Sequence, residues 1–441
     1  MASDKEEFTD LQLEEAMLPE FDYNAAQFVQ CSVENSYHDK VGPTADKVTR
    51  GSVLEFVIPE SVDYTALHES RLELSVKVTK EKGVATDFAA AQNPDKVCVA
   101  NNFAHTIIKS VTIWINGEEA EELQNYPYRA YLDTLTSLRH DALKFRSALV
   151  CWQKDNKEKF TTYEYADDAG GMKERTELFK NSARVPLMLR LHTDLMMQGL
   201  CLPPKSKIKI RVVPHDDAFS LIAAAGKKYE VHILDANLWV SRLKLNPNLM
   251  LAHTKYFEKQ KHLLFPSHRV AVKHFPLAPG IQKKNLTDLF DEPLPDRFLV
   301  GFLSNESFVG TTFNANPFYF QHFNVKKLQA KIGDRNIPNV AYTPNFAQND
   351  YIREYYSLLE EFNCDEGDNT LCISKQEFAS GYTLFPFRLV ERSRGGDLVG
   401  LPICGSASLD LEFHQPLTDT VNVILYYETR GVFKIPKPKI E

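Results

Sequence analysis

Histidines and carboxylates are the residues of this chain best suited to metal binding or acid–base catalysis, but their spacing supports neither. Four of the thirteen histidines fall close together in the chain: His253, His262, His268 and His274. Their intervals of nine, six and six residues match no common zinc-ligand pattern. The sequence also lacks a nucleophile elbow, a P-loop, a G-x-G-x-x-G motif and an H-E-x-x-H motif. We therefore expect no catalytic residues, no metal, no cofactor and no enzymatic activity.

A stripe of cations is the first candidate for a binding surface. It consists of Lys205, Lys207, Lys209 and Arg211. Because side chains alternate across a strand, these cations would share one face. One interpretation is a solvated strand face, or an edge protected by charge. The other is a contact with an acidic patch of a neighbouring subunit, for which the acidic segment from Asp4 to Glu15 is a candidate.

A cluster of aromatic residues, NPFYFQHF at 316–323, is the second candidate. Its central residues are Phe318, Tyr319 and Phe320. Such a cluster belongs either to a buried core or to an interface between subunits, where aromatic side chains dominate the binding energy. Both interpretations stay open at the level of the sequence.

Composition bounds the class of protein. With 441 residues, the chain is long enough for two domains. Its net charge of −8 argues against a body built to neutralise nucleic-acid phosphates. The seven cysteines are scattered without a C-x-x-C pair, which is typical of reduced thiols inside a cell. The N-terminus is acidic, unlike a signal peptide, and no apolar run reaches the roughly 18 residues of a membrane span.

Strands must provide most of the framework. The runs that are rich in Val, Ile and aromatic residues lie at 52–59, 71–78, 106–115, 185–191, 207–213, 229–240, 269–275, 297–303, 323–332, 382–390, 407–413 and 420–428. Turn residues separate these runs, and long helical patterns are few. The chain is therefore predicted to be all-β with a few short helices.

The same helix pattern occurs twice. YRAYLDTL at 128–135 and YIREYYSLLEEF at 351–362 each follow a strand and a turn, and their matching residues are 224 positions apart. These marker residues are Tyr128, Arg129, Tyr131, Leu135, Ile352, Arg353, Tyr355 and Leu359. Apolar residues recur at helical spacing in both segments, which predicts that each helix packs at an equivalent place on its own sandwich.

Further segments repeat in the same order. The pairs are 179–191 with 378–389, 199–213 with 400–413, and 229–236 with 421–428. Each unit has the strand content of a jelly roll with one inserted helix, so we predict two tandem eight-stranded jelly rolls. The predicted divisions are an N-terminal arm (1–49), a first roll (50–235) with a long exposed tower loop at about 154–182, and a second roll (236–441) with a basic C-terminal tail.

Two tandem rolls of this length resemble the double-jelly-roll major capsid proteins of icosahedral DNA viruses. The second half is similar to the hexon-like proteins of adintoviruses and Polinton-type elements. The segments that carry this resemblance are 228–259, 295–328 and 374–390. It extends over roughly residues 50–435 in architecture, and it rests on length, order and these segments together.

The resemblance implies a homotrimer in which six similar sandwiches surround one axis and tile an icosahedral shell. It implies neighbouring capsomers, a penton and minor (cement) capsid proteins as partners, and a virion that is assembled inside the host cell. No sequence-specific nucleic-acid binding and no membrane span are expected. The alternatives are a lectin-like or domesticated jelly-roll binding protein, a jelly-roll enzyme with a metal, and a penton or minor capsid protein, although those usually have one roll.

Overall fold

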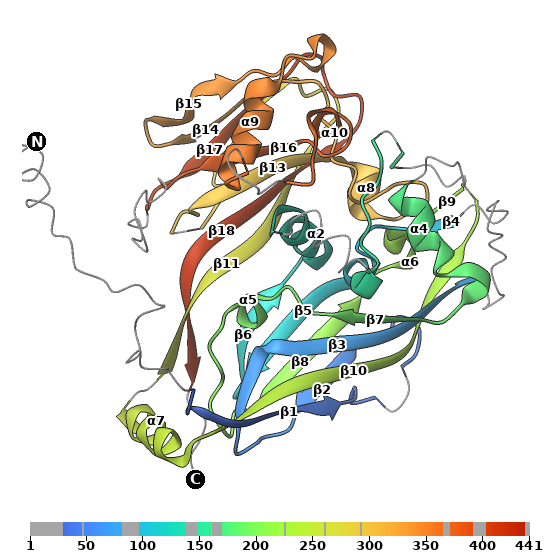
Figure 1. Cartoon of the computed structure of the whole chain (residues 1–441). Helices are drawn as coiled ribbons and strands as arrows, with labels where there is room; N and C mark the ends of the chain where they lie inside the picture. Colours follow the sequence, from blue (N-terminus) through green and yellow to red (C-terminus); the bar gives the residue numbers. More distant parts are fainter. Residues whose placement is uncertain are drawn as a thin grey trace, which may run out of the picture.

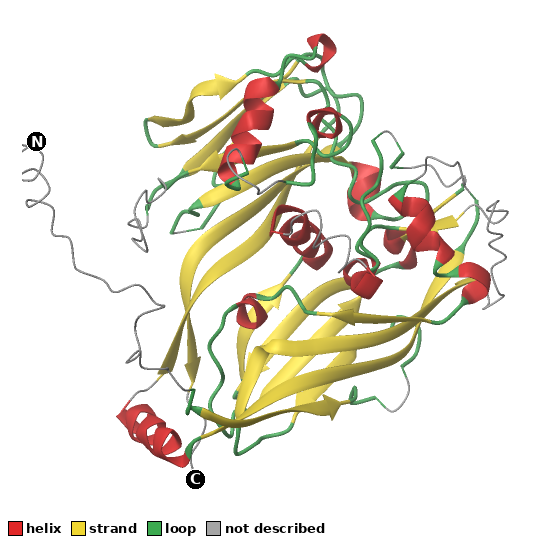
Figure 2. Ribbon diagram, viewed as in Figure 1, coloured by secondary structure: helices red, strands yellow, loops and turns green. Residues whose placement is uncertain are grey.

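The structure of the chain is a computed structural model. It describes residues 30–45, 48–81, 97–137, 148–157, 159–160, 170–224, 226–259, 262–291, 293–364, 371–390 and 403–436. Strands form two separate bodies, which Figure 2 shows with short helices between and around them. In the described part of the chain, no helix is long and apolar enough to cross a membrane.

The first body is a sandwich of two four-stranded sheets. One sheet has the order β1 (Val33–Val41), β10 (Tyr229–Leu245), β3 (Tyr64–Lys80), β7 (Val185–Leu189). The other has the order β2 (Leu54–Ile58), β8 (Ile208–Pro214), β5 (Ile108–Ile115), β6 (Glu118–Leu123). A short pair, β4 (Val97–Val99) and β9 (Leu221–Ala223), extends one end.

The second body repeats this plan. One sheet has the order β11 (His262–Leu277), β18 (Val421–Pro436), β13 (Arg297–Ser304), β16 (Leu384–Arg388). The other has the order β12 (Lys283–Leu286), β17 (Ala407–Phe413), β14 (Val325–Ile332), β15 (Arg335–Tyr342). Taken in chain order, each strand of one body occupies the same place in its sheet as its counterpart in the other. The prediction of two tandem eight-stranded jelly rolls is therefore confirmed.

Short helices connect the strands. They are α1 (Phe103–Thr106), α2 (Tyr126–Ser137), α4 (Gly171–Glu177), α5 (Asp194–Met197), α6 (Asp217–Ser220), α7 (Pro247–Lys259), α8 (Asn305–Val309), α9 (Ile352–Glu361) and α10 (Lys375–Ala379), with 3-10 turns η3 (Lys180–Ser182) and η4 (Phe346–Gln348). The repeated helices α2 and α9 each follow a hairpin at the edge of a sheet, β5–β6 and β14–β15. They therefore occupy equivalent places in the chain order of the two rolls.

Alternating burial explains why the strands form sandwiches. In β17 every second residue is buried, so one face packs against the core and the other faces solvent. In β13, six consecutive residues are buried because both of its faces are covered. Gly301 in this strand has no room for a larger side chain, since an added Cβ would lie 2.6 Å from the Phe320 ring.

The predicted divisions of the chain differ from the structure at three places. Strand β1 lies within the predicted arm, because it completes the first roll by pairing with β10. The predicted boundary at 235/236 falls inside β10, which continues because Leu238 and Val240 belong to the first core. The basic C-terminal tail, predicted at 433–441, begins inside β18, which stays paired with β11 as far as Pro436. Residues 1–29 of the arm and 437–441 of the tail lie outside the described residues.

Candidate functional site, the junction of the two rolls

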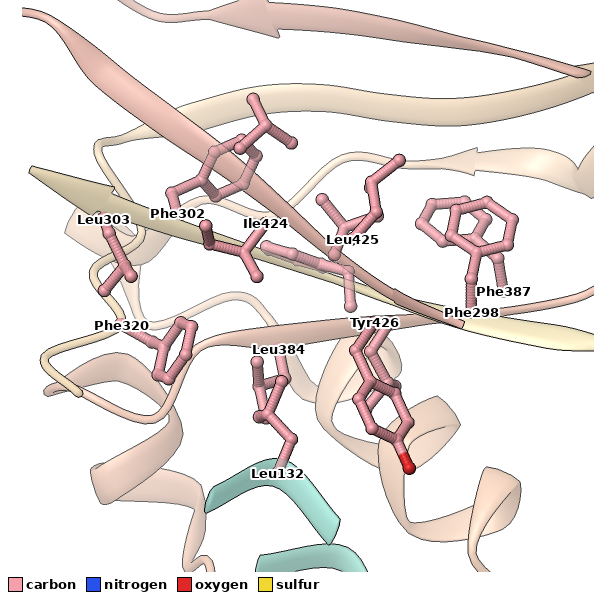
Figure 3. Packing of buried hydrophobic residues seen from close by; sticks show 14 of the residues in the cluster. Leu132, Phe298, Phe302, Leu303, Phe320, Leu384, Phe387, Ile424, Leu425 and Tyr426 are labelled. Atoms are coloured by element: carbon pink, nitrogen blue, oxygen red, sulfur yellow. The ribbon is translucent and has the colours of Figure 1, made fainter. Parts of the chain in front are cut away.

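Helix α2 joins the two rolls. It belongs to the first roll by sequence, yet its apolar stripe lies in the core of the second: Tyr128, Tyr131, Leu132 and Leu135. Figure 3 shows Leu132 pointing towards Leu384 and Tyr426 of the second roll. The opposite side of the helix, with Tyr126, packs in the first core. The helix is therefore shared between the two sandwiches.

This arrangement corrects the prediction that both repeated helices pack alike. Helix α9 packs on β16 and α10 of its own roll, and the Tyr355 hydroxyl donates to the Ile373 carbonyl at 2.9 Å. Leu359 is partly buried there, whereas Ile352 is exposed at 55%. The helices differ because the second roll covers the apolar stripe of α2, whereas the described contacts of α9 lie within its own roll.

The aromatic cluster at 316–323 packs against helix α2 in the junction. The ring of Phe318 stacks on Tyr131, with centroids 4.1 Å apart and planes at 5°. Phe320 is fully buried nearby, and Tyr319 stacks on Phe160 at 4.7 Å. Phe318 and Phe320 expose no surface of their own, so the interpretation of these two rings as contacts between subunits is wrong. They anchor one roll to the other within a single chain.

A buried ion network lies at the centre of the junction. Arg129 on α2 is only 2% exposed. Its guanidinium donates to the Asp194 carboxylate on α5 and to the Val270 carbonyl on β11, the latter at 3.0 Å. Glu121 on β6 lies 3.5 Å from the same guanidinium, and Asp133, one turn along α2, lies 3.6 Å from it. One cation thus ties α2 to elements of both rolls.

Asp133 extends the network into the second roll. Its carboxylate accepts a hydrogen bond from the Tyr426 hydroxyl at 2.6 Å and lies 2.9 Å from the His192 ring nitrogen Nδ1. Glu121 accepts two backbone N–H groups, those of Asp194 and Leu195, at 2.6 and 3.0 Å. Few donors and acceptors of the network remain unpaired, which is the condition for buried polar groups to specify one arrangement.

The network holds more carboxylates than cations. Burial raises the pKa of Glu121 to about 7 despite the nearby Arg129 charge, and burial also raises the pKa of Asp194. For Asp133, burial opposes ionisation, but the His192 hydrogen bond and the Arg129 charge bring its pKa below the usual range. Burial lowers the pKa of His105 well below its ordinary value, and its ring lies 4.9 Å from that of His192. The junction is therefore sensitive to protonation.

A second ion pair lies in the predicted tower loop. Arg175 and Asp155 are both buried and lie 2.7 Å apart. The Tyr382 hydroxyl of the second roll donates to the Asp155 carbonyl at 3.0 Å, and the Asn316 amide donates to the Phe160 carbonyl at 2.8 Å. The described part of this loop therefore includes buried segments packed between the rolls, contrary to the prediction of a wholly exposed loop. Residue 158 and residues 161–169 of the predicted loop lie outside the described residues.

The ends of two long strands form a further contact between the rolls. The β11–β18 ladder runs without a shift from Leu277 opposite Val421 to His262 opposite Pro436. Its far end leaves the second roll and reaches the first, as Figure 1 shows. Leu263, Phe265, Phe433 and Ile435 of that end lie in the first core. The ladder is therefore a second element, besides α2, that packs in both rolls.

The cation stripe has partners within the chain. Lys207 lies 3.1 Å from Glu60, and Lys209 lies 3.1 Å from Glu55 on the neighbouring strand β2. Arg211 lies 3.9 Å from Glu55, and the Lys209 ammonium lies over the Trp114 ring. Lys205 precedes β8 with a positive φ of 60°. These exposed pairs form an outer sheet face, and the contact with a neighbouring subunit stays a prediction.

Of the marker arginines, only Arg129 enters a network. Arg353 lies on the surface, where its guanidinium donates to the carbonyls of Ala341 and Val340 at 2.9 and 2.5 Å. Among the described residues, no group of three or more His, Cys, Asp or Glu could hold a metal ion. Glu121, Asp133 and Asp194 were not among the site residues predicted from the sequence. The available signal was the i, i+4 spacing of Arg129 and Asp133 on a helix.

One curated protein is similar to most of this chain. No family model matches the chain. Among curated proteins, the uncharacterised protein F54H12.2 of Caenorhabditis elegans is 24% identical over 377 residues, which cover 82% of this chain and 85% of that protein.

Solved structures from viruses resemble the chain over almost its whole length. The Faustovirus major capsid protein has a TM-score of 0.60 at 8% identity, covering 95% of this chain and 93% of that one. A chain of the Sputnik virophage structure has a TM-score of 0.61 at 10% identity, covering 98% and 94%. VP54 of PBCV-1 has a TM-score of 0.57 at 12% identity, covering 94% and 97%. At such low identities the likeness establishes the fold, the double jelly roll.

Proposed function

We propose that this protein is the major capsid protein of a DNA virus. In this proposal three copies form a pseudo-hexameric, hexon-like capsomer, and capsomers tile an icosahedral shell. The protein is structural and not an enzyme, and it needs no cofactor. Its partners are its own copies, neighbouring capsomers, and penton and minor capsid proteins. It is made and assembled in the reducing interior of the host cell and functions in the virion.

The observation that carries this proposal is the pair of rolls with matching strand order, fixed to each other by a buried junction. A trimer of such chains presents six similar sandwiches around one axis. A block of this kind needs the two rolls of each chain to keep one relative orientation. Helix α2, the Arg129 network and the β11–β18 ladder supply that rigidity, and the capsid structures that share the fold support the assignment.

Within this class, we propose the adintovirus or Polinton-like type. Support comes from the resemblance of the second half of the chain to hexon-like proteins of that group. A relative encoded by a nematode also agrees with viral elements that reside in animal genomes. The same relative favours a second candidate, a domesticated jelly-roll protein with a binding role in its host. That candidate predicts a monomer or dimer.

Light scattering coupled to size-exclusion chromatography separates the two candidates. The chain has a mass of 50.3 kDa, so the capsid proposal predicts a particle near three times that value. The interface of such an obligate trimer should bury more than about 2,000 Å², so the trimer should persist at micromolar concentration. A monomer at that concentration would refute the capsid proposal and favour the domesticated protein.

A further inference from the structure

An apolar groove lies where the end of the β11–β18 ladder packs against the first roll. Helix α7, the start of β1, the ends of β10 and β11, and the loop at 199–203 enclose a volume of about 530 Å³. Figure 1 places α7 beside the tips of β11 and β18. Leu263 and Phe265 are buried and line the floor of the groove. The Tyr64 hydroxyl lies 2.7 Å from the His253 ring nitrogen Nδ1, and this contact holds α7 against β3.

The rim of this groove exposes large apolar side chains. Leu264 is 61% exposed, Tyr256 is 59% exposed and Leu200 is 48% exposed. Such a grouping on a soluble protein marks a surface that something covers. Exposed cations accompany it, with Lys255 and Lys259 on α7. The occupant should therefore be apolar along one side and acidic on the other.

Residues 1–29 of this chain have that character. They contain eight carboxylates and one lysine, Lys5. Between positions 8 and 21 the large apolar side chains are Phe8, Leu11, Leu13, Met17, Leu18 and Phe21. The cation stripe on β8, which was the first candidate for contact with this acidic segment, already has glutamate partners on its own sheet. The C-terminal residues 437–441 match less well, because they carry two lysines and would repel the rim.

The connection to β1 favours docking within one chain. Ser32 and Val33 themselves line the groove, so the N-terminal residues enter the described fold at its edge. The eight residues between positions 21 and 30 can span up to about 30 Å when extended. A segment tethered this closely has an effective concentration of about a millimolar or more. We propose that residues 8–21 of the same chain dock in this groove through their apolar side chains, with their carboxylates facing the lysines of the rim.

Hydrogen exchange of the full chain tests the docking. Removing residues 1–29 should make amide exchange in residues 249–265 about tenfold faster, because α7 loses its cover. The full-length variant Leu11→Asp with Met17→Asp should have the same effect without shortening the chain. Exchange in 351–362, around α9, should stay unchanged as the internal control. An unchanged rate in 249–265 in both variants would overturn the proposal.

Cross-linking decides which copy supplies the segment. Cys201 lines the groove, so a thiol introduced by Leu13→Cys should be linked to it by a short bismaleimide. The exposed thiols are first removed by Cys31→Ser and Cys404→Ser. In particles formed by unfolding an equal mixture of ¹⁴N and ¹⁵N chains and refolding them together, the linked peptides should come from one isotope only. Peptide pairs of mixed isotope would show that a second copy fills the groove, and an absence of links to Cys201 would contradict docking altogether.

Discussion

Arg129 should be far more important for stability than its repeat counterpart Arg353. Replacing Arg129 with methionine keeps much of the side-chain volume but leaves Glu121, Asp133 and Asp194 buried without their cation. Breaking a buried ion pair by removing one partner costs about 3–5 kcal/mol. The change Arg353→Met removes two hydrogen bonds to backbone carbonyls at the surface and a cation–π contact with the Tyr342 ring, so it should cost only about 1–2 kcal/mol.

The effect of Arg129→Met should depend on pH. In the folded state burial already raises the pKa of Glu121 from 4.5 to about 7, so the folded state binds more protons than the unfolded state between these values. Stability therefore rises as the pH falls through this window. At 1.36 kcal/mol per pKa unit, this shift makes the unsubstituted protein about 3 kcal/mol more stable below this window than above it. Without the Arg129 charge, which lowers the pKa of Glu121, that pKa should rise further, so the loss caused by Arg129→Met should be largest where Glu121 would otherwise be ionised. Asp133, whose pKa is lowered, loses its contribution only at more acidic pH.

Urea unfolding at pH 7.5 and pH 5 measures both effects. We expect Arg129→Met to lose about 3–5 kcal/mol of unfolding free energy at pH 7.5 and clearly less at pH 5. The variant Arg353→Met should show a small loss that is equal at both values. The reasoning would be refuted if the two variants lost the same free energy, or if the deficit of Arg129→Met did not change with pH.

Two further predictions concern packing and the charged sheet face. Gly301→Ala should destabilise the protein by about 1–3 kcal/mol, because its Cβ would meet the Phe320 ring, whereas Gly42→Ala, which meets nothing within 4 Å, should be nearly neutral in thermal unfolding. Equal effects would contradict the packing argument. Reversing Lys207 and Lys209 to glutamate together should cost about 1–2 kcal/mol, since their exposed partners lie within the chain, and should leave the particle mass unchanged. A smaller particle would show that these cations contact a neighbouring subunit.

Much of the fold could be predicted from the sequence because duplication repeats a pattern. The helix pattern around Tyr131 recurs around Tyr355, among strands that recur in the same order, which indicated two rolls, and the strand orders agree. Periodicity shows that a side chain is buried but not against which partner. The sequence therefore could not reveal that Leu132 packs in the core of the second roll while its counterpart Tyr356 is exposed at 52%.

The junction was harder to predict because its parts are distant in the chain. Asp133 and Tyr426 are 293 positions apart, and neither residue type suggests the other. The loop at about 154–182 was expected on the surface because it is polar. A buried pair such as Arg175 and Asp155 is compatible with that composition, since each charge satisfies the other away from water. Such pairings are visible only in three dimensions.

Electron microscopy of the purified protein tests the central claim most directly. The account predicts three-fold symmetric particles with a hexagonal outline, in which six similar lobes correspond to two rolls from each of three chains. Such particles should also assemble into closed shells at higher concentration. Isolated two-lobed particles, with neither trimers nor shells under any assembly condition, would contradict the claim that this double jelly roll builds a capsid.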